Sequence, residues 1–218
     1  MSSTTLEAIR PATAPAIPWA AVATEEQVQA TAEALRARGF QVQVVDDGAS
    51  AREAVLGLIP EGSEVNQGSS TTLDEIGLTD AVNESGRFDA VRPRLRSMDR
   101  ATQGAEIRRL GSTPAWMIGS VHAITQTGSL VTASKSGSQL GPYASGAGKV
   151  IVVAGTNKIV SDLDEALRRI DEHSLPLEDA RAQAAYGMSS SVAKVLIQHE
   201  EPMPGRTTVI LIRDSLGY

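Results

Sequence analysis

A run of hydroxyl side chains behind a glycine is the first feature of this sequence that could do chemistry. In the segment NQGSSTTLDEIG, Gly68 is followed by Ser69, Ser70, Thr71 and Thr72. Glycine lets a ligand approach the backbone closely, and the free amide groups at the start of a helix attract anions. These features would suit a loop that binds a small carboxylate or phosphate.

The same loop could instead serve only its own helix. Thr72 is followed three residues later by Glu75, which fits a capping box that satisfies the amide groups of the first turn. Asp74 and Glu75 would each offset roughly 0.3–1 kcal/mol of the attraction of the helix dipole for an anion. From these residues alone, an anion site and a capped turn are both open.

Three further side chains could act as a base or as an anion clamp, and Glu75, His122 and Lys158 are the candidates. His122 lies in SVHAITQTGSLV and has a side chain whose ordinary pKa is near neutral, although a single strand histidine is more often structural. Lys158 follows an apolar strand, at the edge where parallel sheets bind ligands, but an exposed loop lysine would have the same pattern. The expected ligand-binding residues also include Ser120, Thr125, Thr127, Gly128 and Asn157.

Several classes of site are excluded or disfavoured. The chain has 218 residues and no cysteine, which excludes disulfides, thiol nucleophiles and clusters or zinc sites with thiolate ligands. No HExxH, GxGxxG, GxSxG or complete Walker motif is present, so we expect no metal and no cofactor. The net charge of −6 argues against nucleic acid, and no apolar run is long enough to span a membrane. We expect a cytoplasmic protein.

The order of the elements predicts an α/β fold. The run KVIVVA is apolar throughout, which is typical of a strand buried on both faces of a parallel sheet. We expect a flexible tail over 1–18 and a single domain over 19–218. Helices are expected over 24–38, 50–58, 99–110, 161–172 and 189–199, and strands over 40–45, 64–66, 88–91, 116–126, 130–132, 149–154 and 207–212. This predicts a mostly parallel open sheet with helices on both faces and an inserted antiparallel hairpin.

A basic cluster interrupts this pattern. It consists of Arg92, Arg94, Arg96 and Arg100. We interpret it as a solvated face or connection, because a cluster this short in an acidic protein is weak evidence for nucleic-acid binding.

Four blocks of the sequence together resemble a known family. They are GSSTTLDEIGL (68–78), SVHAITQTGSLV (120–131), KVIVVAGTNKIVSDLDEALRRI (149–170) and VILIRDSLGY (209–218). Their order and spacing are similar to the LUD domain, found in the LutC and YkgG type of lactate-utilization protein. The resemblance spans about residues 20–218. It implies a fold similar to glucosamine-phosphate isomerase, ribose-phosphate isomerase and the CoA transferases, and a part in oxidising lactate to pyruvate beside iron–sulfur subunits.

Two departures from the related patterns limit what is carried over. Some relatives have a cysteine-rich segment where this chain has residues 186–191 without cysteine, so this chain binds no iron–sulfur cluster there. Gln126 stands where many relatives have glutamate before Thr-Gly. An uncharged amide cannot replace the glutamate nucleophile of the related CoA transferases, which disfavours acyl transfer through Gln126.

Three functions remain, in the order in which the sequence favours them. The first is an accessory protein of lactate utilization that binds a small anion or an iron–sulfur partner subunit. The second is a non-catalytic structural protein, and the third is a stand-alone enzyme acting on a sugar phosphate or an acyl-CoA. A symmetric homodimer is the expected assembly. All of the site assignments require that the Gly68 loop, His122 and Lys158 meet around one cavity.

Overall fold

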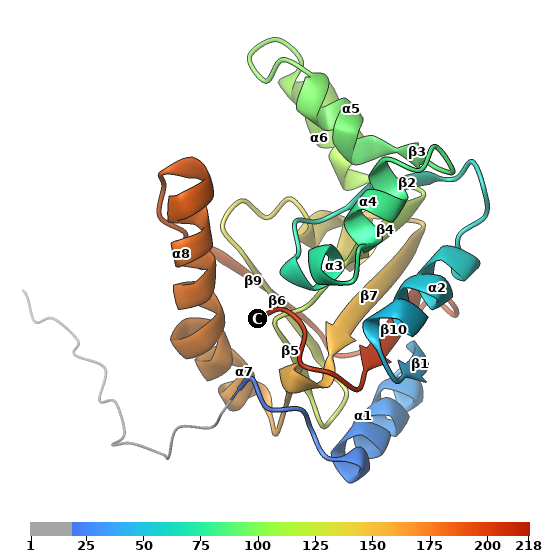
Figure 1. The fold of residues 1–218 in the computed structure, drawn as a ribbon, viewed down its shortest axis with the longest axis vertical. Coiled ribbons are helices and arrows are strands. Elements are labelled where there is room, and N and C mark those ends of the chain that lie inside the picture. Colours follow the sequence, from blue (N-terminus) through green and yellow to red (C-terminus); the bar gives the residue numbers. More distant parts are fainter. Residues whose placement is uncertain (1–18) are drawn as a thin grey trace, which may run out of the picture.

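Two sheets form the framework of the protein. The computed structural model describes residues 19–218, and the tail expected over 1–18 lies outside this range. The larger sheet has six strands, all parallel, in the order β1-β10-β7-β4-β2-β3 (Figure 1). Its strands are β1 (Gln41–Val45), β10 (Thr207–Ile212), β7 (Lys149–Gly155), β4 (Trp116–Gly119), β2 (Glu64–Gln67) and β3 (Asp89–Ala90).

The centre of the larger sheet is apolar on both faces, as the sequence predicts. Strands β7 and β10 are neighbours in register, with Val209 opposite Val152, and their apolar side chains are fully buried. Burial of each such side chain contributes about 1.5–3 kcal/mol. The protein therefore places its most hydrophobic strands where helices can cover both sides.

Helices cover the two faces unequally. The α-helices are α1 (Glu25–Ala37), α2 (Gly48–Leu58), α3 (Thr71–Glu75), α4 (Leu78–Asn83), α5 (Val91–Ser97), α6 (Gly104–Ser112), α7 (Leu163–Arg169) and α8 (Leu175–Tyr186). Leu35 of α1 packs with Val152 on one face, while Val55 of α2 and Leu73 of α3 pack with Ile151 on the other. The predicted α/β architecture with helices on both faces is confirmed.

A second, four-stranded sheet contains the predicted hairpin. Its order is β8-β5-β6-β9, with β8 (Ile159–Val160), β5 (Ala123–Thr125), β6 (Leu130–Ser134) and β9 (Lys194–Gln198). Strands β5 and β6 are antiparallel and joined by a turn in which Gly128 has φ +87. The helix predicted over 189–199 is wrong, because this segment pairs with β6 as β9. Its strand conformation depends on that partner, which lies more than 50 residues away in the sequence.

The strand predicted over 116–126 is in fact two strands in different sheets. Strand β4 ends at Gly119, and the chain then crosses through residues 120–122 to begin β5. Gly119 has no room for a side chain, since an added Cβ would lie 1.7 Å from the Tyr143 hydroxyl oxygen. That hydroxyl donates to the carbonyl of Ser120 at 3.3 Å. The close packing of Tyr143 thus marks the point where the chain changes sheets.

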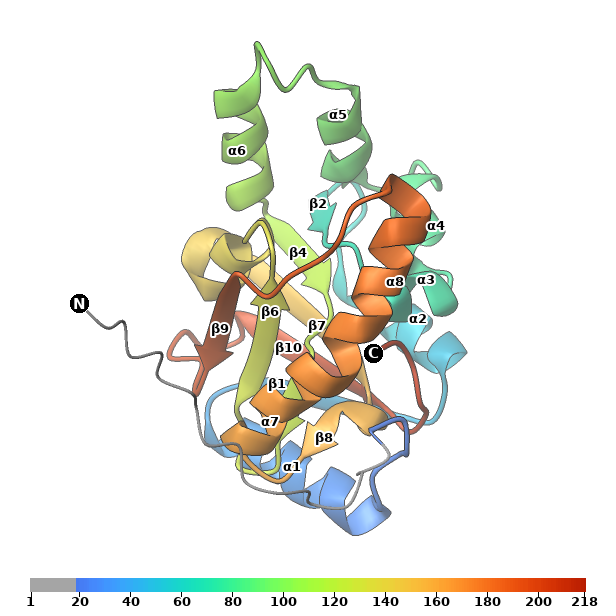
Figure 2. The same cartoon turned by 90° about the vertical axis from the view of Figure 1, so that its left-hand side faces the viewer.

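The basic cluster lies mainly on a helix that the sequence did not predict. Helix α5 carries Arg92, Arg94 and Arg96, and with α6 it projects from the end of the larger sheet (Figure 2). Pro93 is tolerated there because it lies in the first turn, where its missing amide costs nothing. The helix expected over 99–110 begins only at Gly104, since Asp99 caps a separate turn by accepting from the amide of Ala101.

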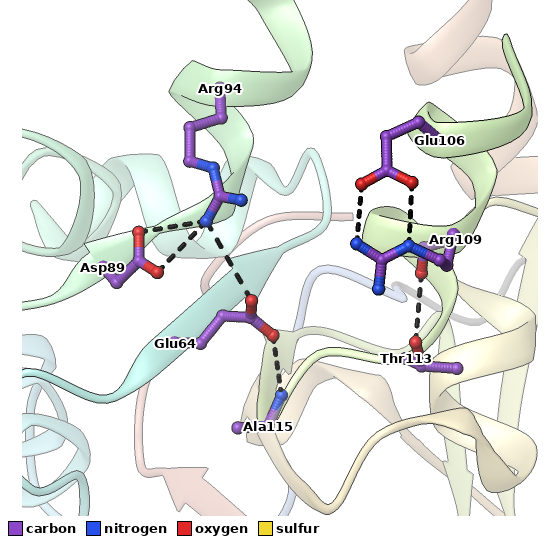
Figure 3. A network of polar contacts seen from close by, with 7 residues as sticks. All are labelled: Glu64, Asp89, Arg94, Glu106, Arg109, Thr113 and Ala115. Carbon is purple, nitrogen blue, oxygen red and sulfur yellow. Dashed lines mark hydrogen bonds and ion pairs between the residues drawn. The ribbon is translucent and has the colours of Figure 1, made fainter. Parts of the chain in front are cut away.

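Ion pairs fasten α5 to the sheet. Arg94 donates to both carboxylate oxygens of Asp89 and lies 4.0 Å from Glu64, while Glu64 also accepts from the backbone amide of Ala115 (Figure 3). These contacts join β3, β2 and the start of β4 at one end of the sheet. Arg94 therefore has a structural role, whereas the other two arginines of α5 form no ion pair among the described residues.

Helix α8 is the second element that the sequence missed. The helix expected over 161–172 is α7, with Asp162 as its N-cap, but it continues through a π-helical turn over Ile170–Ser174 into α8. Pro176 occupies the first turn of α8, where proline is compatible with a helix. Figure 1 shows α8 and α3 on opposite sides of the C-terminus.

Candidate functional site

A cavity of about 570 Å³ lies at the carboxyl edge of the larger sheet. Three adjacent strands supply its floor. The Gly68 loop follows β2, Ser120 and His122 follow β4, and Lys158 lies three residues beyond β7. Because the order of these strands is β7-β4-β2, their carboxyl ends meet at one place. The structure therefore brings together the three segments that the site assignments require.

The Lys158 side chain is buried at the back of this cavity. Its Nζ lies 2.9 Å from Thr72 Oγ1 and 3.0 Å from Ser120 Oγ, and only 2% of the residue is exposed. No ion pair joins Lys158 to a carboxylate in residues 19–218. A buried amine surrounded by hydroxyls is costly to ionise, since hydroxyl groups only partly replace water.

The electrostatics of the cavity follow from this burial. Loss of water and, to a smaller extent, the nearby positive charge of Arg169 together lower the pKa of Lys158 from 10.5 to about 7, against a smaller opposing effect of Glu75. Lys158 is thus populated as both ammonium and amine near neutral pH. It can offer a positive charge to an anion or a lone pair to a proton.

His122 is held neutral beside Lys158. Its Nδ1 accepts from the backbone amide of Ala133 at 3.1 Å, so the proton of the neutral ring is on Nε2. Burial, followed by the charges of Lys158 and Arg169, lowers the pKa of His122 to about 3. The imidazole is therefore a hydrogen-bond donor at neutral pH and does not act as a cation.

The Gly68 loop combines features of both interpretations that the sequence left open. Its N-cap is Ser70, whose hydroxyl accepts from the amide of Leu73, so the capping box expected at Thr72 is wrong. The Thr72 hydroxyl is instead directed to Lys158. Helix α3 has only five residues, which leaves the side-chain hydroxyls rather than a helix dipole as the polar groups of the loop.

Arg92 is a further residue of the site, and the sequence did not indicate it. Its guanidinium donates to the carbonyl of Gly68 at 3.3 Å and to Ser69 Oγ at 2.8 Å, and it forms no ion pair with a carboxylate of the described chain. Burial is the main reason that the pKa of Arg92 is lowered, yet arginine stays charged at neutral pH. Arg92 thus places a positive charge at the loop that the sequence predicted to bind an anion.

Basic groups outnumber acidic ones around the cavity. The basic residues of its lining are Arg92, Arg96, Lys135, Lys158 and Arg181, and the acidic ones are Asp74 and Glu178. Glu178 is already engaged, since it forms a bidentate pair with Arg181 and accepts from the Tyr218 hydroxyl. The whole protein has a net charge of −6, so the positive lining is a local feature.

Part of the predicted set lies elsewhere. The residues that do not line the cavity are Glu75, Thr125, Thr127, Gly128 and Asn157. Glu75 is exposed and accepts from the backbone amide of Gly217 at 2.7 Å, while Asn157 binds the backbone of the same C-terminal segment. Thr125, Thr127 and Gly128 form the far turn of the β5–β6 hairpin, where Thr125 and Thr127 bond to each other. This turn lies outside the cavity, because only residues 120–122, which precede the hairpin, directly follow the carboxyl end of β4.

Other lining residues had weak signals in the sequence. The arginines of α5 belong to the basic cluster of the sequence. Which of their side chains face the cavity depends on helix α5, which the sequence did not predict. Glu178 and Arg181 have the i, i+3 spacing of a helical ion pair, which would identify α8 as a helix but not as a wall of the cavity. Tyr218 lines the cavity because of the course of the C-terminal segment, which no local sequence pattern indicates.

Within residues 19–218, no group of three or more His, Asp or Glu side chains is arranged to hold a metal ion. The helices in that range are all too short or too polar to cross a membrane.

The fold and the site together define an α/β protein with a cavity at the carboxyl edge of a parallel sheet. The family model of the LUD domain matches residues 28–212, and the chain belongs to the LUD domain family. Membership supports, at the level of the family, a role related to lactate utilization. No curated protein matches the sequence significantly.

Three solved structures are distantly similar to this chain. A DUF162 family protein from Deinococcus radiodurans is 12% identical with a TM-score of 0.49, over 86% of this chain and 96% of that one. A ribose 5-phosphate isomerase from Plasmodium falciparum is 14% identical with a TM-score of 0.37, over 78% and 95%. The eIF2B beta of Chaetomium thermophilum is 18% identical with a TM-score of 0.35, over 57% and 42%.

Proposed function

We propose that this protein is an accessory protein of lactate utilization that binds a small carboxylate, such as lactate or pyruvate, in the cavity beside Lys158. The observation that supports this most directly is the excess of basic over acidic side chains around a cavity in an acidic protein. A carboxylate entering the cavity gains favourable electrostatic interactions that the rest of the surface does not offer.

The individual groups suit a carboxylate with a neighbouring oxygen. Arg92 offers N–H donors in a fixed planar arrangement, which matches the two oxygens of a carboxylate. The hydroxyls of Ser69 and Ser120 and the Nε2–H of His122 can donate to a carbonyl or hydroxyl oxygen. Both 2-hydroxy and 2-oxo acids carry this combination of groups.

The role in lactate oxidation beside iron–sulfur subunits comes to this chain from its family and is part of the proposal. It predicts that the chain co-purifies with a cluster-bearing subunit from cells grown on lactate. The cytoplasmic location and the symmetric dimer expected from the sequence remain predictions. The alternative of an enzyme acting on a sugar phosphate would use the same basic lining, so the ligand panel must include phosphate.

Titration calorimetry tests the binding proposal. Lactate and pyruvate should release or take up heat on binding, whereas lactamide, which has no charge, should not. Arg92→Met should weaken carboxylate binding by roughly 10-fold or more, the usual worth of a charged hydrogen bond. Arg108→Met is the matched control, since Arg108 is exposed and outside the cavity.

Absence of heat with both carboxylates, or equal affinity for lactamide, would refute the proposal. Tight binding of inorganic phosphate without lactate binding would favour the sugar-phosphate alternative instead.

A further inference from the structure

Ser120 and Lys158 form a pair that carboxylate binding alone does not require. Ser120 Oγ lies 3.0 Å from Lys158 Nζ, and Ser120 is half-buried in the wall of the cavity. The amine lies deeper, with 2% of the residue exposed. A ligand in the cavity therefore meets the hydroxyl first and the amine behind it.

We propose that Ser120 is a nucleophile and that Lys158 is its general base, giving the protein an acyl-transfer activity toward small, negatively charged carboxylic esters. A serine hydroxyl next to a neutral lysine is a known type of activated nucleophile. The proposal goes beyond ligand binding, because it assigns a reaction to the same cavity.

The hydrogen bonds around the amine orient its lone pair. The Thr72 hydroxyl lies 3.3 Å from the carbonyl oxygen of Leu216 and can donate to it, so Thr72 Oγ1 is free to accept from Lys158 Nζ. A neutral amine that donates to Thr72 can turn its lone pair to the hydroxyl hydrogen of Ser120. The competing contact of Ser120 Oγ with the carbonyl of Val121 is longer, at 3.4 Å. Thr72 is thus a positioning residue for Lys158.

Two other properties of the cavity fit this role. Since the pKa of Lys158 is about 7, a large fraction of the amine is neutral at physiological pH and able to take a proton. His122 adds a neutral N–H donor on the same wall, suited to a developing oxyanion. The basic lining selects esters that carry a negative charge.

The reaction balances with groups that the cavity contains and with water. Ser120 Oγ forms a bond to the acyl carbon while its proton moves to Lys158 Nζ. The ester C–O bond then breaks, and the proton passes from Lys158 to the departing alcohol. In the second half, water attacks the acyl-serine, Lys158 takes the proton of the water, and Ser120 Oγ leaves with that proton. No oxidant, reductant or metal enters either half.

Labelling of the full-length protein with a fluorophosphonate tests the nucleophile. Mass spectrometry should find one phosphonyl group per chain, attached to Ser120. Ser120→Ala should abolish the label, whereas Ser85→Ala, which changes an exposed serine outside the cavity, should leave the rate unchanged. A chain that stays unlabelled, or one labelled at a different residue, would overturn the proposal, and this result on the unmutated protein does not depend on any variant folding.

The role of Lys158 needs a separate measurement. The labelling rate should rise between pH 6 and pH 8 with a midpoint near 7, because only the neutral amine accepts the proton. Lys158→Met should slow labelling by about 100-fold or more, and Thr72→Val by a smaller factor, with folding checked by circular dichroism. Equal rates in Lys158→Met and the parent protein, or a rate independent of pH, would contradict the assignment of the base.

Substrate class is tested with 4-acetoxybenzoate, an anionic ester, against its uncharged methyl ester. The anionic compound should give a burst of 4-hydroxybenzoate equal to the number of chains, and the methyl ester a smaller rate. Absence of a burst from both esters, or a faster rate with the methyl ester, would contradict the proposed specificity. Calorimetric binding of lactate is measured independently, so either proposal can fail while the other stands.

Discussion

Lys158 and Thr72 are 86 residues apart in the sequence, and their side chains meet in a buried hydrogen bond of 2.9 Å. The contact joins the turn after β7 to the first turn of α3, the helix that follows β2, across the intervening strand β4. It makes the ionisation of one buried amine depend on the packing of three strand ends. Several consequences of this arrangement can be measured.

The stability of the protein should depend on pH through Lys158. The folded protein holds Lys158 with a pKa of about 7, while the unfolded chain has the ordinary value of 10.5. Between these values the unfolded state binds the extra proton, so the free energy of unfolding should rise with pH, by up to about 1.4 kcal/mol per pH unit from this group. Urea denaturation at pH 7.5 and 9 should show a steeper rise for the parent protein than for Lys158→Met. Parallel curves would mean that Lys158 ionises normally.

Affinity for a carboxylate should change with pH in the opposite direction. The ammonium form of Lys158 attracts the anion, and this form disappears as pH rises through about 7. Affinity for lactate should therefore fall by up to about tenfold per unit above pH 7. Titration calorimetry at pH 6 and 8.5 measures the ratio. Lys158→Met should bind more weakly at pH 6 and show no such fall, and a fall that persists in this variant would point to another group.

The imidazole of His122 should not titrate in the physiological range. Burial lowers the pKa of His122 to about 3, and its Nδ1 is occupied by the amide of Ala133. Nitrogen NMR of the side chain should show a neutral ring with the proton on Nε2 from pH 5 to pH 8. A midpoint near 6.5 would show that water reaches the ring freely and that the cavity is more open than the structure indicates.

Gly119 should be intolerant of a side chain because of Tyr143. The Cβ of Gly119→Ala would lie 1.7 Å from the Tyr143 hydroxyl oxygen, and the resulting overpacking should cost about 1–3 kcal/mol of stability. In the Tyr143→Phe background the nearest ring atom is 3.0 Å away, so the same change should cost less. Thermal denaturation of the four proteins gives the coupling between the two positions.

A second glycine serves as the control for that experiment. Gly57 lies within α2 and has no atom within 4 Å of an added Cβ, so Gly57→Ala should raise stability by up to about 1 kcal/mol. If Gly119→Ala were equally harmless, the Tyr143 hydroxyl would not fill the space that the structure gives it.

Much of the fold was predictable because local patterns agree with it. The apolar run of β7, the alternation of β1 and the Thr24 cap of α1 each favour the observed element without help from distant residues. The segment 189–199 is different, since it forms β9 only because β6 offers a free edge. Its sequence is compatible with a helix, and tertiary pairing overrides that preference.

The site was predictable to about the same extent as the fold. The positions of the Gly68 loop and Lys158 after expected strands favoured their convergence, because parallel strands end at a common edge. Ser120 was expected inside a strand over 116–126, and only the structure places it just after the end of β4. Arg92 was missed, since its direction follows from the docking of α5 through Arg94 and Asp89. Glu75 was included as a candidate base, but its exposed carboxylate accepts from the backbone amide of Gly217 and does not line the cavity.

The sequence by itself determined the α/β class, the family and the ends of two of the three strands that form the floor of the cavity, β2 and β7, because periodicity and motif order are local properties of the chain. Only the tertiary structure decided that the amine of Lys158 is buried between two hydroxyls and forms no ion pair with a carboxylate of residues 19–218. Burial and the distances between side chains depend on segments far apart in the sequence, and these two quantities set the ionisation of a group.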